Sequence, residues 1–457
     1  MQKLNKIKSL LWLLLISPSL VIANVSEYQL ENGLKLIVKE DHRAPVAVTQ
    51  VWYKVGASYE HNGITGISHQ LEHMMFKGTK NLAPNEFSRI IAANGGRENA
   101  FTGRDYTAYF QTMEADRVEV SFRLEAERMR NLVIDEAELL KEKEVVAEER
   151  RMRTEDNPTA LTREAFYATA FTNSPYHHPV IGWMSDINHY QAEDLRAWYQ
   201  KWYAPNNAIV VVVGDVNSDE VYQLAKQYFG PLAAEKTGEV KPQQEIEQLG
   251  KRTVAVNAPA ELPYIMMGWK VPVVATADQS WEPYALDMLA GILDGSSSAR
   301  FATDLIRGEE IAANISAGYS LFARLDDVFV VAGTPSDDHS VEQLQQAVMK
   351  QIEQLKTQTV TEQELERIKV QVVANAVYER DSVFYQAMQL GMLETVGLDW
   401  RLSDAYVDNI KAVTAEQVQQ VAQKYFTNQS LTVARLIPQP VTEKKQRAMT
   451  AGGRHGH

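Results

Sequence analysis

The chain has 457 residues, of which 45% are hydrophobic and 23% are charged, and its formal net charge is −13. This length exceeds what one typical core organises, so we expect two or more domains in an ordinary soluble globular protein. The acidic charge disfavours nucleic acid as a partner, because phosphate binding needs a basic patch. The chain has no cysteine, which excludes cysteine catalysis and thiolate metal sites and suits an oxidising compartment.

The first 23 residues have the three-part layout of a secretory signal peptide. Lys3, Lys6 and Lys8 precede an apolar run that ends in small residues near Ala23. The alternative is a membrane anchor, but the run from Leu10 to Ala23 is shorter than the about 20 residues that a spanning helix needs. No later segment resembles a span. We therefore expect cleavage near Ala23 and export to the periplasm, with no stable membrane span.

The mature chain begins with two alternating apolar runs around Asn32-Gly33, which predict a tight β-hairpin. The alternating stretch 46–56 predicts a further strand. The stretch 194–216 predicts a helix, a break at Pro205-Asn206-Asn207 and a buried strand. Between these strands, helical patterns occupy five segments, near 64–77, 84–94, 116–132, 136–153 and 159–170.

The pattern of helix, aromatic pair, polar turn and strand recurs near the C-terminus. Lys201-Trp202-Tyr203 matches Lys424-Tyr425-Phe426 at an offset of 223, and residues 136–149 resemble residues 362–375 at an offset of 226. Degenerate patterns can coincide, but two matches at nearly the same offset favour a duplicated domain. Strands and helices mix without strict βαβ alternation, so we expect an α+β arrangement in each half.

A charged, proline-containing stretch near 231–250 predicts a linker between the halves. The tail 439–457 is expected to be disordered. Its His455 and His457 could bind metal loosely, but a frayed terminus is the preferred interpretation. The mature chain is thus expected to have two domains, an N-terminal domain over 24–235 and a homologous C-terminal domain over 251–438, joined by a linker over 236–250.

Residues 67–79, ISHQLEHMMFKGT, hold two histidines and a glutamate within five positions. On a helix at about 100° per residue, His69, Glu72 and His73 project from one face. Two imidazoles one turn apart can hold one zinc ion, and the glutamate can reach a water on that ion. The alternative is a satisfied pair of surface histidines. The apolar flanks indicate instead a buried helix, in which histidines need partners.

The spacing H-x-x-E-H is typical of the inverzincins. A catalytic zinc needs three protein ligands and an open position, so the third ligand must lie elsewhere. Residues 63–79 resemble the active-site helix of the pitrilysin/insulinase family of zinc metalloendopeptidases, in its short two-domain bacterial type, which is similar to mitochondrial processing peptidase subunits. The resemblance implies two homologous α+β domains, each a mainly antiparallel sheet packed with helices, that form half of a clam-shell chamber.

In that family a glutamate on a second helix completes the site, and residues 142–158 resemble this helix. The resemblance implies that Glu149 is the third ligand and that Glu142, two helical turns earlier, orients the histidines and this ligand without binding the metal itself. Composition alone does not separate Glu149 from Glu148. For Glu148 and the other neighbouring acids, a solvated helix face is the preferred interpretation.

Residues 95–113 resemble the family segment in which an edge strand pairs with extended substrate. Asn99 and Ala100 match the substrate-contacting positions of that segment. An ordinary hairpin is an alternative that is compatible with this role. We interpret His177 and His178, which lie further along the chain, as structural.

The second half departs from the family pattern. It lacks H-x-x-E-H, and Asn375 stands where the first half has Glu149. The family's second half holds the substrate carbonyl with an arginine and a tyrosine. Arg307 matches this arginine as a substrate-binding residue, but the tyrosine position falls on Ala313 or Asn314. We hypothesise that the active unit is a dimer, either of identical chains or with a related chain that supplies an Arg/Tyr pair.

These features predict an exported endopeptidase with one Zn²⁺ per chain, in which Glu72 activates the zinc-bound water to hydrolyse oligopeptides or unfolded segments. The alternative is a non-catalytic structural or substrate-binding subunit of a related peptidase complex. Such subunits have usually lost a ligand or the base, whereas all four positions are present here. A structural or storage zinc site is a third option, but it needs four protein ligands and leaves Glu72 without a role.

Overall fold

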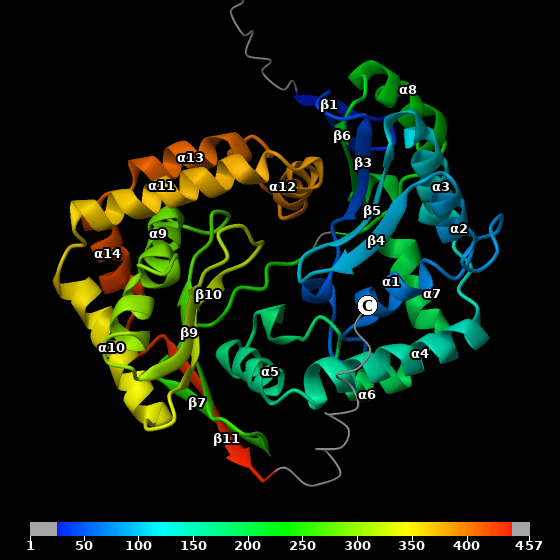
Figure 1. Ribbon diagram of the computed structural model, residues 1–457. Coiled ribbons are helices and arrows are strands. Elements are labelled where there is room, and N and C mark those ends of the chain that lie inside the picture. The colour runs from blue at the N-terminus through cyan, green and yellow to red at the C-terminus, as the bar shows by residue number, and fades with distance from the viewer. Residues whose placement is uncertain (1–24, 239, 441–457) are drawn as a thin grey trace, which may run out of the picture.

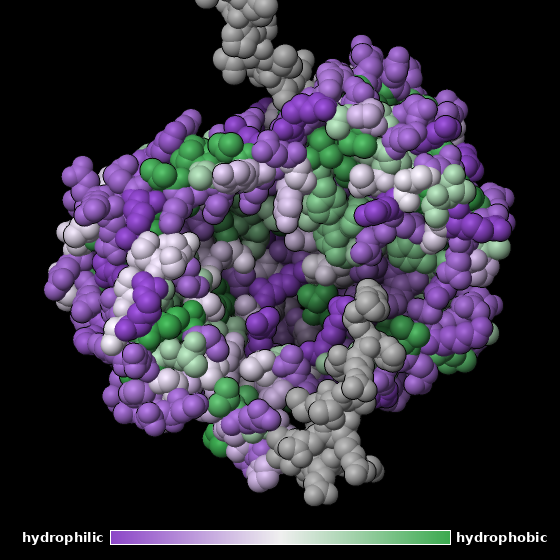
Figure 2. Space-filling view, in the orientation of Figure 1, coloured by the Kyte–Doolittle hydropathy of each residue, from purple (hydrophilic) through white to green (hydrophobic). Residues whose placement is uncertain are grey.

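The computed structural model describes residues 25–238 and 240–440, so the expected signal peptide and the histidines of the C-terminal tail lie outside the described residues. The described chain forms two sheets, each packed with helices, which confirms the expected α+β class (Figure 1). Figure 2 shows one face of the molecule hollowed between the two halves, with hydrophilic side chains in the hollow. No helix in the described part of the chain is long and apolar enough to cross a membrane.

The first half builds a six-stranded sheet in the order β1-β2-β6-β3-β5-β4. The predicted hairpin joins the first two strands, and Gly33 adopts φ +89° in its turn, a conformation that glycine tolerates without strain. The last strand, β6, lies parallel to β2 and antiparallel to β3. The strands are β1 (Val25–Gln29), β2 (Lys35–Glu40), β3 (Val46–Tyr53), β4 (Arg97–Thr102), β5 (Thr107–Glu114) and β6 (Ala208–Gly214).

The helices of the first half follow the predicted segments within a few residues at each end. The predicted helix at 136–153 ends earlier, because a π-helical turn, η3 (Arg151–Glu155), replaces its last part. The α-helices are α1 (Ile67–Met74), α2 (Glu86–Ala93), α3 (Val118–Asn131), α4 (Glu136–Arg150), α5 (Pro158–Ala170), α6 (Met184–His189), α7 (Ala192–Trp202) and α8 (Ser218–Tyr228). Short 3-10 turns are η1 (Ala57–Tyr59), η2 (Ala115–Arg117), η4 (Pro175–His177) and η5 (Pro205–Asn207).

The second half builds a five-stranded sheet in the order β7-β11-β8-β10-β9, which repeats the order β2-β6-β3-β5-β4 of the first half. Its last strand again lies parallel to the first strand and antiparallel to the next. The strands β6 and β11 begin at residues 208 and 431, which are 223 positions apart, as the sequence match predicts. The strands are β7 (Arg252–Pro259), β8 (Tyr264–Val271), β9 (Ala312–Gly318), β10 (Asp327–Pro335) and β11 (Leu431–Gln439).

The helices of the second half gather on the outer side of its sheet, apart from one (Figure 1). The exception, α12, lies on the sheet of the first half. The helices are α9 (Glu282–Asp294), α10 (Val341–Thr357), α11 (Glu362–Glu379), α12 (Val383–Thr395), α13 (Leu402–Ala412) and α14 (Ala415–Tyr425), with a π-helical turn η6 (Phe301–Ile306).

Each half lends one helix to the sheet of the other. Helix α12 packs on β3 and β6, so closely that a side chain at Gly391 would meet the indole of Trp52 at 2.1 Å. Reciprocally, α5 packs on β7, β8 and β11, and a side chain at Gly268 would meet the ring of Phe166 at 2.5 Å. Two mixed hydrophobic clusters therefore join the halves.

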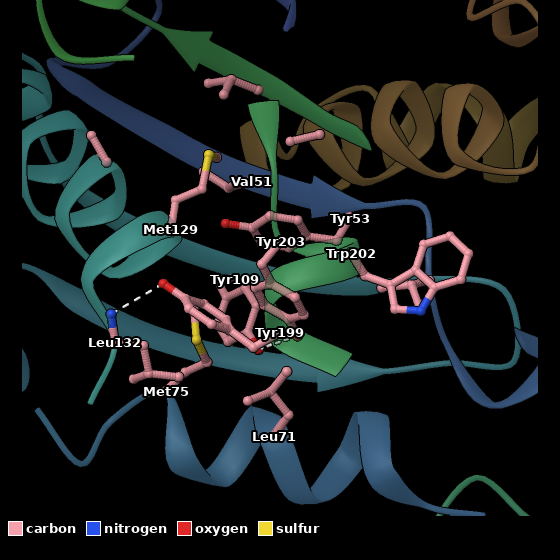
Figure 3. Packing of buried hydrophobic residues seen from close by; sticks show 14 of the residues in the cluster. Val51, Tyr53, Leu71, Met75, Tyr109, Met129, Leu132, Tyr199, Trp202 and Tyr203 are labelled. Carbon is pink, nitrogen blue, oxygen red and sulfur yellow. Dashed lines mark hydrogen bonds between the residues drawn. The ribbon is translucent and has the colours of Figure 1, made fainter. Parts of the chain in front are cut away.

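The helix that carries the H-x-x-E-H motif rests on an aromatic layer of the first sheet (Figure 3). Leu71 of α1 and the following Met75 point toward Tyr109 and Tyr203, and all four side chains are buried. The hydroxyl groups of Tyr109 and Tyr203 share a hydrogen bond of 2.9 Å, which satisfies both in the core. This packing fixes the polar face of α1 away from the sheet.

The segment over 236–250, which the sequence predicts as a linker, has neither helix nor strand among its described residues. It is nevertheless anchored. Glu245 accepts hydrogen bonds from the backbone N–H groups of residues 172–174 and forms an ion pair with Lys270 at 2.8 Å. At the far end, β11 continues to Gln439, one residue beyond the expected end of the second domain.

Candidate metal site and active site

The first turn of α1 is held by a buried carboxylate. Glu60 accepts the backbone N–H of Gly66 at 2.6 Å and that of Ser68 at 2.9 Å, two groups that the helix itself leaves unpaired. Gly66 has φ +83° and lies against the chain at Ile181, whose carbonyl oxygen a side chain would meet at 2.3 Å. Burial raises the pKa of Glu60 to about 7. Glycine and this acid together set where the helix begins.

His69 and His73 come from consecutive turns of α1, and Glu149 comes from the last turn of α4. The Nε2 atoms of the two histidines lie 3.7 and 3.4 Å from the same oxygen of Glu149, Oε2. The three ligand atoms all fall within 4.8 Å of one another. Within residues 25–238 and 240–440, this is the only such group of three metal-binding side chains.

This arrangement fits a zinc ion. Zinc bound tetrahedrally at about 2.0–2.1 Å separates its ligand atoms by about 3.4 Å, close to the two distances from Glu149. Two imidazole nitrogens and one carboxylate oxygen also form the donor set of an open catalytic site. His69, His73 and Glu149 are therefore the residues that would hold the metal.

Burial and mutual contacts shift the pKa values of all three residues. Burial and the neighbouring His73 lower the pKa of His69 to about 4, so that its imidazole is neutral at physiological pH. Burial also acts to lower the pKa of His73, but hydrogen bonds to Glu149 and Glu142 outweigh it and raise the value. The hydrogen bond from His73 is the main cause of the lowered pKa of Glu149, which stays ionised.

The expected orienting group, Glu142, lies behind His73. Its Oε2 is 3.3 Å from His73 Nδ1, the ring nitrogen that faces away from Glu149, and its Oε1 pairs with Lys77 Nζ at 2.5 Å. A carboxylate in this position fixes the ring orientation and tautomer of a ligating histidine. The second oxygen of Glu149, Oε1, pairs at 2.7 Å with Arg153 of η3, whose side chain is exposed.

Glu72 projects from the same face of α1 toward β4. Thr102, the last residue of that strand, donates its hydroxyl to Glu72 Oε2 at 2.6 Å. Burial raises the pKa of Glu72, and the bond from Thr102 opposes the shift. A partly desolvated carboxylate of raised basicity is the group that a general base requires. Sequence reasoning missed Thr102, which lies three residues after Asn99 in the same segment.

Asn99 and Ala100 lie on β4, which is the outer strand of the first sheet and pairs only with β5. The N–H of Ala100 donates to a side-chain acceptor, Asn99 Oδ1, at 2.9 Å. A backbone donor on an open strand edge is the group to which an extended peptide adds. The edge is next to the metal-binding group, because α1 packs against β4.

One cavity of about 690 Å³ brings these elements together. It contains every predicted site residue of the first half except Glu142, and also His177 and His178. His177 Nδ1 donates to the carbonyl oxygen of Ser174 at 2.7 Å, and His178 Nε2 lies 3.2 Å from Asn62 Oδ1. The further lining residues that sequence reasoning missed include Thr102, Arg104, Arg153, Arg163, Tyr167 and Tyr176.

Arg307 does not join this group. It follows η6 in the second half, donates to Ser297 O at 2.6 Å and does not line the cavity. Tyr319, the nearest tyrosine in sequence to the expected tyrosine position, donates its hydroxyl to Pro272 O at 2.6 Å, a contact within the second half. Within one chain, these residues do not provide the Arg/Tyr pair.

Comparisons with known proteins decide the family. Residues 35–182 match the family model described as insulinase (peptidase family M16), and residues 189–372 match the model described as peptidase M16 inactive domain. The zinc protease PqqE of Helicobacter pylori is 36% identical over 361 residues, which cover 77% of this chain and 79% of that protein. The chain belongs to the insulinase family, peptidase family M16. It is thus of the pitrilysin/insulinase type that the motifs resemble.

Other similar proteins and solved structures match this chain over almost its whole length. The uncharacterized zinc protease YmxG of Bacillus subtilis is 26% identical, covering 88% of this chain and 96% of that protein. A crystal structure of a protease from Helicobacter pylori superposes with a TM-score of 0.86 at 31% identity, covering 91% of this chain and all of that one. The periplasmic protease PqqL of Escherichia coli shares the fold at a TM-score of 0.75 and 19% identity, but this chain covers only 50% of it.

Proposed function

We propose that this M16 family member is an exported, zinc-dependent endopeptidase that hydrolyses oligopeptides or unfolded segments. The observation that carries the proposal is the meeting of His69 Nε2 and His73 Nε2 at one oxygen of Glu149, in a cavity that Glu72 and an open strand edge share. A closed structural site would use a fourth protein ligand and would have no place for a free carboxylate.

The chain's own residues supply three functions in this reaction. The edge of β4 binds the peptide backbone in extended form, which orients the scissile bond. Glu72 accepts the proton of the attacking water and returns it to the leaving amine. His69, His73 and Glu149 would hold zinc, which when bound lowers the pKa of water and polarises the scissile carbonyl.

The second candidate function is a non-catalytic substrate-binding subunit. The match to the model named for an inactive domain gives it some support. That match covers residues 189–372, however, and both helices that carry the zinc ligands lie before it. The insulinase match covers the segment with His69, Glu72, His73 and Glu149, so we favour catalysis.

We further propose that the working unit is a dimer in the periplasm. The PqqL chain, described as periplasmic, is about twice the length that this chain covers. A second M16 chain would supply an equivalent missing half and, if it is a related rather than an identical chain, the Arg/Tyr pair. The signal-like N-terminus supports export.

The test compares the mature wild-type protein with Glu72→Gln. We expect about one zinc per chain in both proteins by elemental analysis. Cleavage of a quenched extended peptide is expected to stop with a chelator and to fall by about 10²–10⁴-fold in the variant. Zinc binding without cleavage, whether the chain is alone or with its native partner, would favour the subunit role. Normal cleavage by Glu72→Gln would remove Glu72 as the base.

A further inference from the structure

The turn between β4 and β5 reaches across to the second half of the chain, at the wall of the candidate cavity. Arg104 and Asp105 occupy this turn. They face Arg324 and Asp327, which lie in the connection from β9 to β10 and at the first position of β10. The strand orders make these two hairpins equivalent, so each half presents an arginine to an aspartate of the other.

In the first of these ion pairs, which is mostly buried, one guanidinium nitrogen contacts both carboxylate oxygens. Arg104 Nη1 lies 3.1 Å from each carboxylate oxygen of Asp327, and Asp327 is only 4% exposed. The guanidinium of Arg104 also lies over the rings of Tyr167 and Tyr176, at 4.3 and 4.9 Å from their centroids. A buried charge held on several sides has one position rather than many, because releasing it leaves its partner unpaired.

The second pair sits on the other side of the turn. Asp105, also 4% exposed, accepts Arg324 Nε at 3.3 Å and the backbone N–H of Arg324 at 3.2 Å. The hydroxyl groups of Ser58 and Tyr176 donate to the same carboxylate. Arg324 Nη2 closes the network by donating to Ser58 Oγ at 2.8 Å. The turn is thus fixed by side chains from both halves.

This network is one residue away from the catalytic machinery. Thr102, which donates to Glu72, ends β4, and Arg104 follows two positions later. Between them, Gly103 O accepts the N–H of Ala57 at 3.2 Å, so the backbone has little freedom to absorb a movement of the turn. A displaced turn would therefore move Thr102 and the open edge at Ala100. The metal ligands lie on α1 and α4, outside the network.

We propose that Arg324 and Asp327 are positioning residues through which the metal-free half holds the peptide-binding edge of β4 in register with Glu72. The proposal rests on the proposed peptidase function and deepens it, because it gives the second half a defined part in substrate binding. It implies that the second half controls KM for extended peptides while zinc affinity is set by the first half alone.

The test uses the mature protein with Arg324→Met or Asp327→Asn. We expect KM for an extended quenched peptide to rise about tenfold, which corresponds to the loss of one or two backbone hydrogen bonds to the peptide. Zinc content is expected to stay unchanged. Hydrogen exchange of the amides in 97–102 is expected to accelerate. Arg324→Lys, which keeps the charge, should restore part of the affinity.

The matched control is Glu394→Gln. Glu394 is 8% exposed and pairs with Lys35 at 2.8 Å, so this variant also breaks a buried ion pair between the halves, but away from the β4–β5 turn. We expect a lowered Tm with KM and exchange of 97–102 unchanged. An equal KM shift in the control, or unchanged KM and exchange in Arg324→Met, would overturn the proposal.

The same variants separate this inference from the peptidase function. A wild-type protein that binds zinc but cleaves nothing would refute the proposed catalysis. Two measurements then report on the position of β4 without catalysis. They are the affinity of a fluorescent extended peptide, measured by anisotropy, and the hydrogen exchange of the amides in 97–102. Wild-type values of both in Arg324→Met would refute the positioning role on their own.

Discussion

The Nδ1 atom of His73 lies 3.3 Å from a carboxylate oxygen of Glu142, on the side of the ring opposite the atom that faces Glu149. Glu142 thus fixes which nitrogen of His73 is presented to a metal. We expect Glu142→Gln to weaken zinc binding by about 10–100-fold, as measured by competition with a chromogenic chelator. Glu144→Gln changes an exposed acid of the same helix and serves as the control. Equal zinc affinity in the two variants would contradict this role.

Glu148 and Glu149 are adjacent in sequence but differ in role. Glu149 faces both histidines, whereas Glu148 is 60% exposed and pairs with Arg151. We expect Glu149→Gln to abolish stoichiometric zinc binding at neutral pH, because it removes the only anionic ligand. Glu148→Gln is expected to retain wild-type zinc content. Elemental analysis after dialysis measures both, and the reverse pattern would move the third ligand to Glu148.

The N–H of Ala100, which donates to the side chain of Asn99, predicts an effect of proline at this position. Proline is tolerated on an outer strand where the N–H faces away from the ladder, so Ala100→Pro is expected to fold. It removes one backbone donor from the peptide-binding edge, which should raise KM by about tenfold at unchanged zinc content. Ala100→Val keeps the donor and is expected to bind peptide nearly as the wild type does. A normal KM in the proline variant would argue against strand addition at β4.

Glu60 predicts a pH dependence of stability. Its pKa is raised by burial from 4.5 to about 7 in the folded protein, so the folded state retains the proton over a range in which the unfolded chain has lost it. The stabilisation is complete below about pH 4.5 and is lost as the pH rises to about 7, with a total of roughly 3 kcal/mol. The free energy of unfolding of the wild type, measured with urea, should therefore fall between pH 5 and pH 8 by more than that of Glu60→Gln. A constant difference between the two proteins would refute the raised pKa.

The fold was predictable where sequence patterns are local or repeated. The match between Lys201-Trp202-Tyr203 and Lys424-Tyr425-Phe426 anticipated the repeated strand order, because segments that pack in equivalent places need similar residues. The exchange of α5 and α12 was not predictable from these patterns. An amphipathic helix has the same periodicity whichever sheet it covers, so periodicity does not identify its partner.

The candidate site also has residues that the sequence predicts and residues that it does not. His69, Glu72 and His73 stand out because their spacing places them on one helical face. Glu149 came from the family resemblance, since many acids share its helix and no local rule selects one. The contact of Thr102 with Glu72 and the pairing of Arg104 with Asp327 join residues far apart in sequence. Such pairs leave no periodic trace, and only the folded chain reveals them.

The crossing of α5 and α12 also governs how the molecule comes apart. A protease that nicked the connecting segment 236–250 would leave two fragments, each carrying a helix that completes the other's core. The fragments should therefore co-purify as a complementing pair and separate only on denaturation. Neither half expressed by itself would be expected to reach a stable state, since one face of its sheet would stay bare. The two homologous halves are therefore expected to unfold together, as a single cooperative unit.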